Sequence, residues 1–281
     1  MDRYRTQQIG FAVMSLSAIV VVAPIMIVIG IVLVEGARAI SWGFIFSMPY
    51  EGMKEGGIFP AIVGTLILTV GTAVAAIPVG VAGTVYLAEY AGDTWITRAI
   101  RLAIVNLAGI PSIVYGLFGL GMFVLFLHMG TSILAGVLTL AIMTLPVIMS
   151  TSEEALRAVP MEFRTVSASL GGTRWQAVRY IVLPQALPGI ITGIILGILR
   201  AAGETAPILF TVAAFYLPRL PQTPFDQVMA LPYHLYVIST QVPAMPIRVQ
   251  YGTALVLLFI VLSMNVAATA LRSYFRRRRQ W

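Results

Sequence analysis

The chain of 281 residues contains no cysteine, and its only histidines are His128 and His234. The lack of cysteine excludes a disulfide framework and a cysteine metal site. The two histidines lie far apart in the sequence, so we expect no metal centre. The Gly-x4-Gly-Lys-Ser/Thr loop that cradles nucleotide phosphates is missing too, and we therefore expect that this chain does not hydrolyse ATP itself.

Charged residues are also scarce in this sequence. They make up 10% of the chain, whereas a soluble domain has about 25%. Hydrophobic residues make up 59%, and this composition predicts an all-α integral membrane protein with most of its surface in lipid. The net charge of +7 is explained by an excess of Lys and Arg on the cytoplasmic side of the membrane, so we expect no nucleic-acid partner.

Six apolar segments are long enough to cross a bilayer, which takes about 20 helical residues. The first segment is too long and too uniformly apolar for the core of a signal peptide, so we expect it to be a retained membrane anchor. The six predicted spans are 9–34, 58–82, 99–127, 132–150, 187–215 and 251–271.

The distribution of the 18 basic residues predicts the orientation of these spans. If the N-terminus is inside, 13 basic residues lie in cytoplasmic segments, Arg200 lies within a span, and four lie outside: Arg38, Lys54, Arg219 and Arg248. This excess predicts that both termini are cytoplasmic. We expect the membrane to be the cytoplasmic (inner) membrane of a bacterium or an archaeon.

Prolines occur inside four successive predicted spans. Proline has no N–H group, so each one frees the carbonyl group four residues earlier in its helix. Free carbonyl groups are tolerated in a membrane where helices pack together or line a cavity. We therefore expect bent helices around a pathway, with the bends at Pro78, Pro111, Pro146 and Pro207.

The largest predicted cytoplasmic segment is residues 151–186. We expect short helices in it, broken at Pro160, at Gly171–Gly172 and at Pro184. Trp175, Val178 and Ile181 recur at three-residue spacing, which predicts an amphipathic helix with an apolar stripe. Periodicity alone fits two roles for this helix, which are lying on the membrane surface and docking onto a partner.

Gly171, followed after nine residues by Ile181 and then by Leu183–Pro184, resembles the cytoplasmic loop motif of ABC-importer permeases, often called the EAA loop. The resemblance implies that a short helix around Gly171 docks into a groove on a cytoplasmic ATPase subunit and transmits its closure. Glycine permits a close helix approach and a tight turn. Ala168 matches a small residue of the motif, but Thr165 stands where the family has a glutamate, so the contacts of that glutamate do not carry over.

Three further stretches resemble the permeases of phosphate-specific (Pst) importers: GGIFPAIVGTLILT, GIPSIVYGLFGL and RAAGETAPILFT. GETAPILFT and the later PFDQVMALPYHLY favour the PstA-like over the PstC-like branch. The resemblance covers roughly residues 57–271 and implies the type I ABC importer permease fold. We divide the chain into an N-terminal span with an extracytoplasmic segment (1–57), a permease domain of five spans (58–272) and a basic cytoplasmic tail (273–281).

The resemblance also implies the function and the partners. The chain would be the permease subunit of an ATP-driven importer of inorganic phosphate. It would pair with a PstC-like permease, two ATPase subunits that bind ATP and Mg, and an extracytoplasmic phosphate-binding protein, and it would bind no cofactor itself. Other oxyanions (phosphonate, sulfate, molybdate) remain alternatives. A proton-coupled carrier is disfavoured because we find no convincing internal repeat, and the spans lack the constellation of an enzyme.

Arg200 and Glu204 place two charges near the middle of the predicted span 187–215, where each is costly. Their spacing predicts that they share a helix face, and an ion pair that merely eases insertion is one explanation. Acid before base is the better order for such a pair, and apolar replacements of buried pairs are often neutral or stabilising. We favour a polar station on an anion path, where the planar fork of Arg200 offers parallel donors to phosphate and Glu204 balances its charge.

Overall fold

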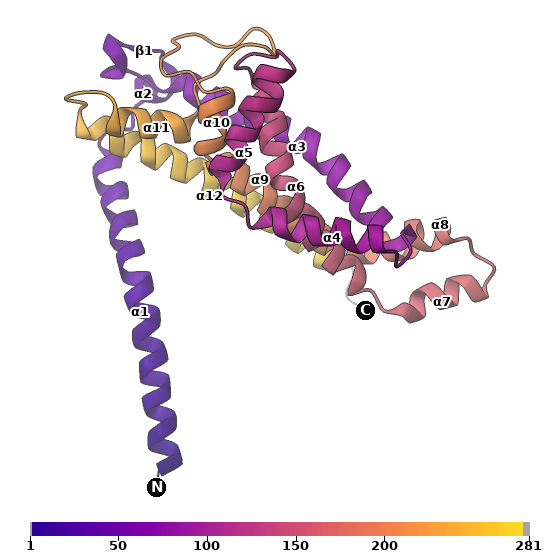
Figure 1. The fold of residues 1–281 in the computed structure, drawn as a ribbon. Helices are drawn as coiled ribbons and strands as arrows, with labels where there is room; N and C mark the ends of the chain where they lie inside the picture. The colour runs from indigo at the N-terminus through magenta and orange to yellow at the C-terminus, as the bar shows by residue number, and fades with distance from the viewer. Residues whose placement is uncertain (1, 278–281) are drawn as a thin grey trace.

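The computed structural model describes residues 2–277, and its regular structure is almost entirely helical (Figure 1). Five helical stretches are long and apolar enough to cross a membrane. They are α1 (Asp2–Ala37), α3 (Phe59–Val85) with the π-helical turn η2 (Tyr86–Tyr90), α6 (Ile133–Arg157), the run of α8 (Arg174–Ala177), η4 (Val178–Val182) and α9 (Leu183–Gly203), and α12 (Ile247–Arg277).

A sixth candidate span is a bent pair of helices. α4 (Trp95–Ala108) is followed by α5 (Ser112–Gly119) and the π-helical segment η3 (Leu120–Phe126), and the two parts meet at an angle of 107°. If the bent pair counts as one span, the described chain has the six spans that the sequence predicts. The predicted third span is therefore not a straight helix, because the chain breaks at Gly109–Pro111.

The core of the bundle is formed by α3, α6 and α9, with α6 between the other two. Ile148 of α6 is fully buried, and it faces a glycine on each neighbouring helix. A Cβ atom added at Gly80 of α3 would lie 2.9 Å from Ile148, and one added at Gly197 of α9 would lie 2.8 Å from it. Small residues therefore let the three backbones approach closely.

One end of the bundle, which we call the outer end, carries several short elements. These are α2 (Trp42–Phe46), the antiparallel pair β1 (Pro49–Tyr50) and β2 (Glu55–Gly56) with the 3-10 turn η1 (Glu51–Met53), α10 (Ala206–Thr211) and α11 (Leu231–Thr240). The backbone N–H of Leu231 donates to Thr65 Oγ1 of α3 at 2.8 Å, and Leu231 is fully buried. The long segment before α12 is thus an ordered part of the fold.

The opposite end, which we call the inner end, carries α7 (Met161–Ser169) and α8 (Figure 1). The beginning of α1 and the end of α12 also lie away from α2 and α11. Both therefore lie on the side of the bundle that carries α7. That this side is cytoplasmic remains a prediction. The predicted limit between residues 272 and 273 falls inside α12.

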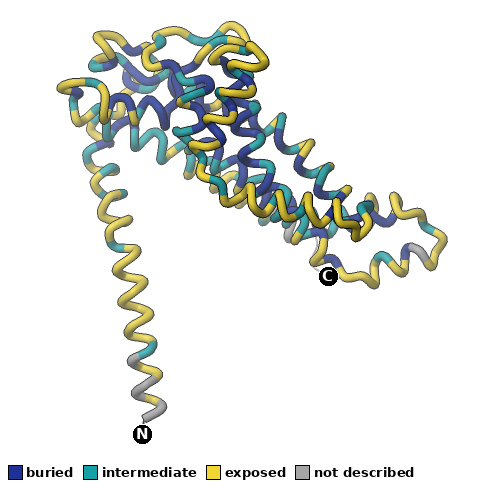
Figure 2. The backbone as a smooth tube through the Cα atoms, viewed as in Figure 1, coloured by how far each residue is buried: buried dark blue, intermediate teal, exposed yellow. Residues whose placement is uncertain are grey.

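α1 stands apart from the bundle, and most of its length is exposed on all sides (Figure 2). It contacts α12 near the outer end, where Gly36 lies against the Tyr251 carbonyl oxygen and Leu255. A helix that is apolar all round is stable only when lipid or another protein covers it. The isolated subunit therefore leaves this helix to such surroundings.

The predicted fifth span, 187–215, is wrong in outline. The helical run begins at Arg174 and ends at Gly203, and Glu204 adopts an extended conformation with ψ of 137°. α10 is a separate short helix, so Pro207 stands in its first turn and bends no span. Pro184 does not break the chain either. It stands in the first turn of α9, which continues the π-helical turn η4, and Leu183 N–H there donates to the Val178 carbonyl.

The other predicted bends have different outcomes. Pro111 lies at the break before α5, where the two helices diverge by 107°. Pro78 and Pro146 lie within the continuous helices α3 and α6, and bending there remains a prediction. Pro24 and Pro188 also lie inside helices, α1 and α9, and neither is among the predicted bends.

Candidate translocation and coupling sites

Arg200 and Glu204 are in contact, but not as a pair on one helix face. Arg200 lies in the last turn of α9, and Glu204 is the extended residue that caps its C-terminal end. Arg200 Nε donates to Glu204 Oε1 at 3.2 Å. The Arg200 side chain is 36% exposed and that of Glu204 is 17% exposed. The contact therefore joins the end of α9 to the start of the irregular segment that follows.

The pair lies at the end of α9 and not in the middle of a continuous helix. Ala201 and Glu204 line the same small cavity as Leu140, which lies seven residues into α6 from its outer end. Seven residues correspond to about 10 Å of helix. The pair therefore lies nearer the outer end of the bundle, where α9 stops, and its depth in the membrane remains a prediction.

The remaining donors of Arg200 have no partner in the described chain. Nε is held by Glu204, and neither Nη1 nor Nη2 donates a hydrogen bond to any residue whose side chain the structure describes. The cavity beside Glu204, which Thr65 and Thr69 also line, has a volume of about 10 Å³. That volume suits a single water molecule, so a larger anion would have to meet Arg200 on its exposed side.

The two irregular spans meet beside this pair. A Cβ atom added at Gly116 of α5 would lie 2.9 Å from the Ala206 carbonyl oxygen at the start of α10. One added at Gly119 would come within 2.9 Å of Thr211. The break after Gly203 and the bent pair α4–α5 thus pack together. Irregular backbone at this depth is tolerated where it is covered by protein or lines a cavity, and discontinuous helices often form substrate sites.

The inner end presents a helical hairpin formed by α7 and α8. Gly171 lies in the turn between them with φ of +78°, a left-handed conformation that favours glycine. Thr173 caps α8 in a reciprocal arrangement, since its N–H donates to Gln176 Oε1 at 2.8 Å and Gln176 N–H donates to Thr173 Oγ1 at 3.3 Å. A Cβ atom at Gly171 would meet nothing within 4 Å, so the turn is open to a partner.

The residues of the predicted loop motif fall on two different elements. Gly171 follows α7, and Ala168 belongs to α7, although its side chain lies outside the described residues. Ile181, Leu183 and Pro184 are half-buried in the helical run that continues into α9. The motif therefore spans the hairpin and its root, and its role in coupling remains a prediction.

The predicted apolar stripe of this loop is partly wrong. Trp175 is exposed, but Val178 is only 1% exposed and packs inside the subunit, so it offers nothing to a partner. Further exposed apolar residues lie on α7 and in the turn after it, among them Phe163, Val166 and Leu170. Their spacing of three and four residues is a helical signal in the sequence that was missed.

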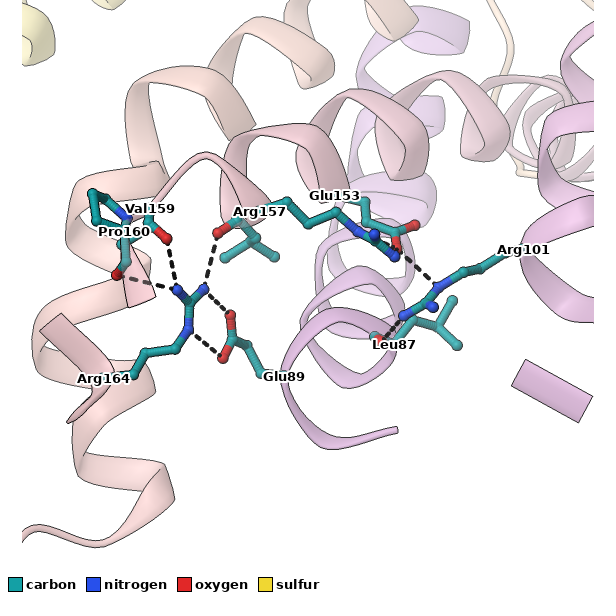
Figure 3. Close-up of polar contacts among 9 residues, drawn as sticks. Leu87, Glu89, Arg101, Glu153, Arg157, Val159, Pro160 and Arg164 are labelled. Carbon is teal, nitrogen blue, oxygen red and sulfur yellow. Dashed lines mark hydrogen bonds and ion pairs between the residues drawn. The ribbon is translucent and has the colours of Figure 1, made fainter. Parts of the chain in front are cut away.

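A set of ion pairs at the inner end was also missed (Figure 3). Glu89 of η2 is 7% exposed and faces Arg164 of α7. Arg164 Nη2 donates to Glu89 Oε1 at 2.7 Å, and Nε donates to Oε2 at 3.2 Å. The only sequence signal was a lone carboxylate in the otherwise apolar and aromatic stretch YLAEY.

A second cluster lies next to this one (Figure 3). Arg101 of α4 has its Nε 2.9 Å from Glu153 Oε1 of α6, although that N–H is not aligned for a hydrogen bond. Arg157 also pairs with Glu153, at 2.8 Å. Arg101 Nη2 donates to the Leu87 carbonyl at 2.6 Å, so the π-helical turn η2 contacts both clusters.

Several groups outside the spans have shifted pKa values. The Arg98 guanidinium, hydrogen-bonded to Asp93, lowers the pKa of that carboxyl group. Hydrogen bonds from the backbone N–H groups of Gln222 and Thr223 lower the pKa of Asp226. Burial lowers the pKa of His234 in α11 from 6.5 to about 4. No group of three His, Asp or Glu side chains suited to a metal ion occurs among the described residues.

The comparison with protein families gives the class of the protein. Residues 80–281 match the family described as binding-protein-dependent transport system inner membrane component. The chain therefore belongs to this family, and it is a multi-pass inner-membrane protein.

Curated relatives narrow the class further. The chain is 34% identical to the probable ABC transporter permease protein YqgI of Bacillus subtilis, with 95% of each chain covered. It is 35% identical to the phosphate transport system permease protein PstA 1 of Mycobacterium tuberculosis, with 94% of this chain and 86% of the relative covered. The predicted likeness to PstA-like permeases of ABC importers is confirmed.

Solved structures support the fold. The chain is similar to a bacterial ABC transporter involved in the import of the acidic polysaccharide alginate, with a TM-score of 0.67, 14% identity, and 96% and 97% of the two chains covered. It is also similar to the MetNI methionine ABC transporter, with a TM-score of 0.62, 16% identity, and coverages of 78% and 97%. The predicted all-α type I importer permease fold is confirmed.

Proposed function

We propose that this chain is the permease subunit that carries inorganic phosphate across the cytoplasmic membrane, driven by ATP hydrolysis in separate subunits. The observation that carries the proposal is the guanidinium of Arg200, which Glu204 holds through one nitrogen while the two terminal nitrogens stay available. A planar fork of parallel donors suits the oxygens of phosphate. The relatives named for phosphate transport favour this ion over sulfate, molybdate or phosphonate.

The exposed side of Arg200 indicates where the ion would pass. In a heterodimer with a PstC-like permease, the meeting point of the two irregular spans would face the partner and become the wall of a shared pathway. The ion must lose part of its hydration there, and fixed N–H donors replace some of that water. Glu204 competes with the ion for Arg200 and so prevents the ion from being trapped.

The inner end gives a place for the ATPase subunits. α7 and its turn project from the bundle, and they expose Phe163, Val166 and Leu170 beside the open turn at Gly171. An apolar helix face of this kind fits a groove on another protein. Two ATPase subunits would bind ATP and Mg, one on each permease, and a phosphate-binding protein would deliver the ion outside. This chain would be non-catalytic.

The experiment that tests the proposed ion is uptake by the complete importer in cells that lack other phosphate transporters. We expect saturable uptake of radiolabelled phosphate that excess unlabelled sulfate or molybdate does not reduce. Uptake of sulfate or molybdate in place of phosphate would contradict the proposed substrate and leave the permease class intact.

The orientation of the chain in the membrane can be tested separately. We expect a reporter fused after the last residue to be cytoplasmic and one inserted near Pro221 to be external.

A further inference from the structure

Glu89 is an unusual residue for the end of an apolar span, because a buried carboxylate is costly unless it is paired. It lies in the π-helical turn η2, where Ala91 N–H donates to the Tyr86 carbonyl at 2.8 Å. π-Helical turns are rare in proteins, and many of those that occur lie at functional sites. The turn projects Glu89 away from α3 toward α7, which is 75 residues away in the sequence.

Arg164 uses every one of its N–H groups in contacts that join three elements (Figure 3). Besides the two bonds to Glu89, Nη2 donates to the Leu156 carbonyl at 3.0 Å, and Nη1 donates to the carbonyls of Val159 at 2.7 Å and Pro160 at 3.4 Å. Arginine has five N–H donors, so none is left free. The side chain thereby fastens α7 both to η2 and to the C-terminal end of α6.

Apart from this arginine, α7 packs mainly on α8 and η4, and few of its other residues are buried. Its apolar residues Phe163 and Val166 are exposed, as is Leu170 in the turn that follows it. The apolar cluster at this end instead joins α6 to η4 and α9, through Leu156 and Val182 among others. Arg164 and Glu89 supply a side-chain contact between α7 and η2, the turn that ends α3.

We propose that the Glu89–Arg164 pair is the joint that transmits movement of α7 to α3 and α6 during transport, which makes both positioning residues. This inference rests on the proposed docking of an ATPase subunit on α7. A bidentate ion pair fixes the orientation of its two partners as well as their distance, so α7 and η2 would move together. Arg101 extends the joint to α4, which continues through the bend into α5 and so reaches α10 beside Arg200.

The test uses the complete importer purified with its ATPase subunits, its second permease and its binding protein, and reconstituted in lipid vesicles. Three quantities are measured per assembled complex: basal ATP hydrolysis, its stimulation by ligand-loaded binding protein, and uptake. Glu89→Gln keeps the shape of the side chain but removes its charge. We expect normal assembly and basal hydrolysis, with stimulation and uptake reduced at least about five-fold, the size of a typical coupling effect.

Two further variants serve as comparisons. Arg164→Lys keeps the charge but loses the planar fork and has only three donors, so we expect a loss of stimulation at least as large as for Glu89→Gln. Asp93→Asn is the matched control, because Asp93 and Arg98 form a bidentate pair at the same end, at 2.8 and 2.6 Å, that is exposed and does not touch α7. We expect this control to behave as the wild type.

A distance measurement gives a readout that does not depend on activity. The chain has no cysteine, so spin labels can be placed at Thr165→Cys on α7 and Val79→Cys on α3, both exposed positions. We expect one narrow distance distribution with and without ATP, and a broadened distribution when Glu89→Gln is added. An equally narrow distribution in the variant would contradict a joint.

The outcomes separate this inference from the proposed function. Wild-type stimulation in Glu89→Gln would overturn the joint, and so would losses in every variant that merely follow the amount of assembled complex. Stimulated ATP hydrolysis by the wild type without phosphate uptake would instead contradict the proposed ion. In that case the ratio of stimulated to basal hydrolysis still decides whether the joint exists.

Discussion

The outer and inner ends of the bundle each hold an arginine paired with a glutamate, and the two pairs are built differently. Arg200 and Glu204 are four residues apart, share one hydrogen bond, and leave the arginine more than a third exposed. Glu89 and Arg164 come from distant parts of the chain, share two hydrogen bonds, and are mostly buried. Arg164 has all five donors engaged, whereas Arg200 has one.

The contrast teaches how the same two residue types can serve different purposes. An arginine with no spare donors contributes geometry, because it holds the surrounding backbone in one arrangement. An arginine with unused donors on its exposed side can bind a ligand and release it. We therefore assign the translocation site to the outer pair and the transmission of movement to the inner pair.

The first way to break this comparison is to remove the inner arginine. Arg164→Met leaves Glu89 buried without its partner and deprives three backbone carbonyl groups of a donor. Breaking a buried pair in this way costs about 3–5 kcal/mol of stability. We expect a clear drop in the thermal unfolding midpoint of the purified importer, and a change no larger than that of the exposed-pair variant Arg98→Met would contradict the structural side of the comparison.

His234 is a buried titratable group without a partner in the described chain, and it can be compared with the two paired glutamates. Burial holds the pKa of His234 at about 4, below its ordinary value of 6.5, and its Nδ1 has no partner among the described residues. The unfolded chain therefore binds a proton that the folded chain excludes, and stability falls as the pH drops from 6.5 toward 4. The shift corresponds to roughly 3 kcal/mol.

The measurement for His234 is the unfolding midpoint at pH 7.5 and at pH 5. We expect the wild type to lose more stability between these values than His234→Gln does. His128→Gln is the control, because His128 is exposed. Equal acid sensitivity in the wild type and His234→Gln would show that other groups cause it.

A smaller effect on stability is expected at the turn between α7 and α8. Gly171→Trp forces a side chain into a left-handed conformation, which costs about 1–2 kcal/mol. Gly52 is a matched control at the outer end, since it also has positive φ and nothing within 4 Å of an added Cβ atom. We expect Gly171→Trp, but not Gly52→Trp, to reduce co-purification of the ATPase subunit. Equal recovery with both variants would argue against docking at this turn.

The smallest effect should come from the acid of the outer pair. Glu204→Gln removes the group that competes with the ion but leaves Arg200 in place. We expect phosphate to enter and to leave slowly, so that uptake falls a few-fold and is not abolished. Complete loss of uptake in an assembled complex would mean that Glu204 is needed to orient Arg200, and the competitor role would be wrong.

Much of the fold could be predicted from the sequence, because long apolar segments and the loop motif are local signals. The break after Gly203 could not be predicted. A spacing of four residues between Arg200 and Glu204 is the same whether the helix continues through both residues or ends between them. Pro207 was the available signal, since proline is favoured in the first turn of a helix. It was instead interpreted as a bend within one long span.

The inner joint was beyond sequence reasoning for a different reason. The residues that form it lie 75 positions apart, and no periodicity connects them. The predicted stripe at Trp175, Val178 and Ile181 had the correct period, but the packing of Val178 against the bundle decides which face is free. A single sequence gives the period of a helix, whereas the neighbouring elements determine its orientation.

The most direct test of the account is uptake of radiolabelled phosphate per assembled complex when Arg200 is replaced. Arg200→Met should abolish uptake while the complex still assembles, and Arg200→Lys should remain badly impaired because a point charge cannot reproduce the planar fork. Arg38→Met is the control, since Arg38 pairs with Glu35 at the same distance of 3.2 Å but lies exposed at the outer end. Normal uptake by Arg200→Met, or failure of that variant to assemble, would show that the pair is structural and that the anion path runs elsewhere.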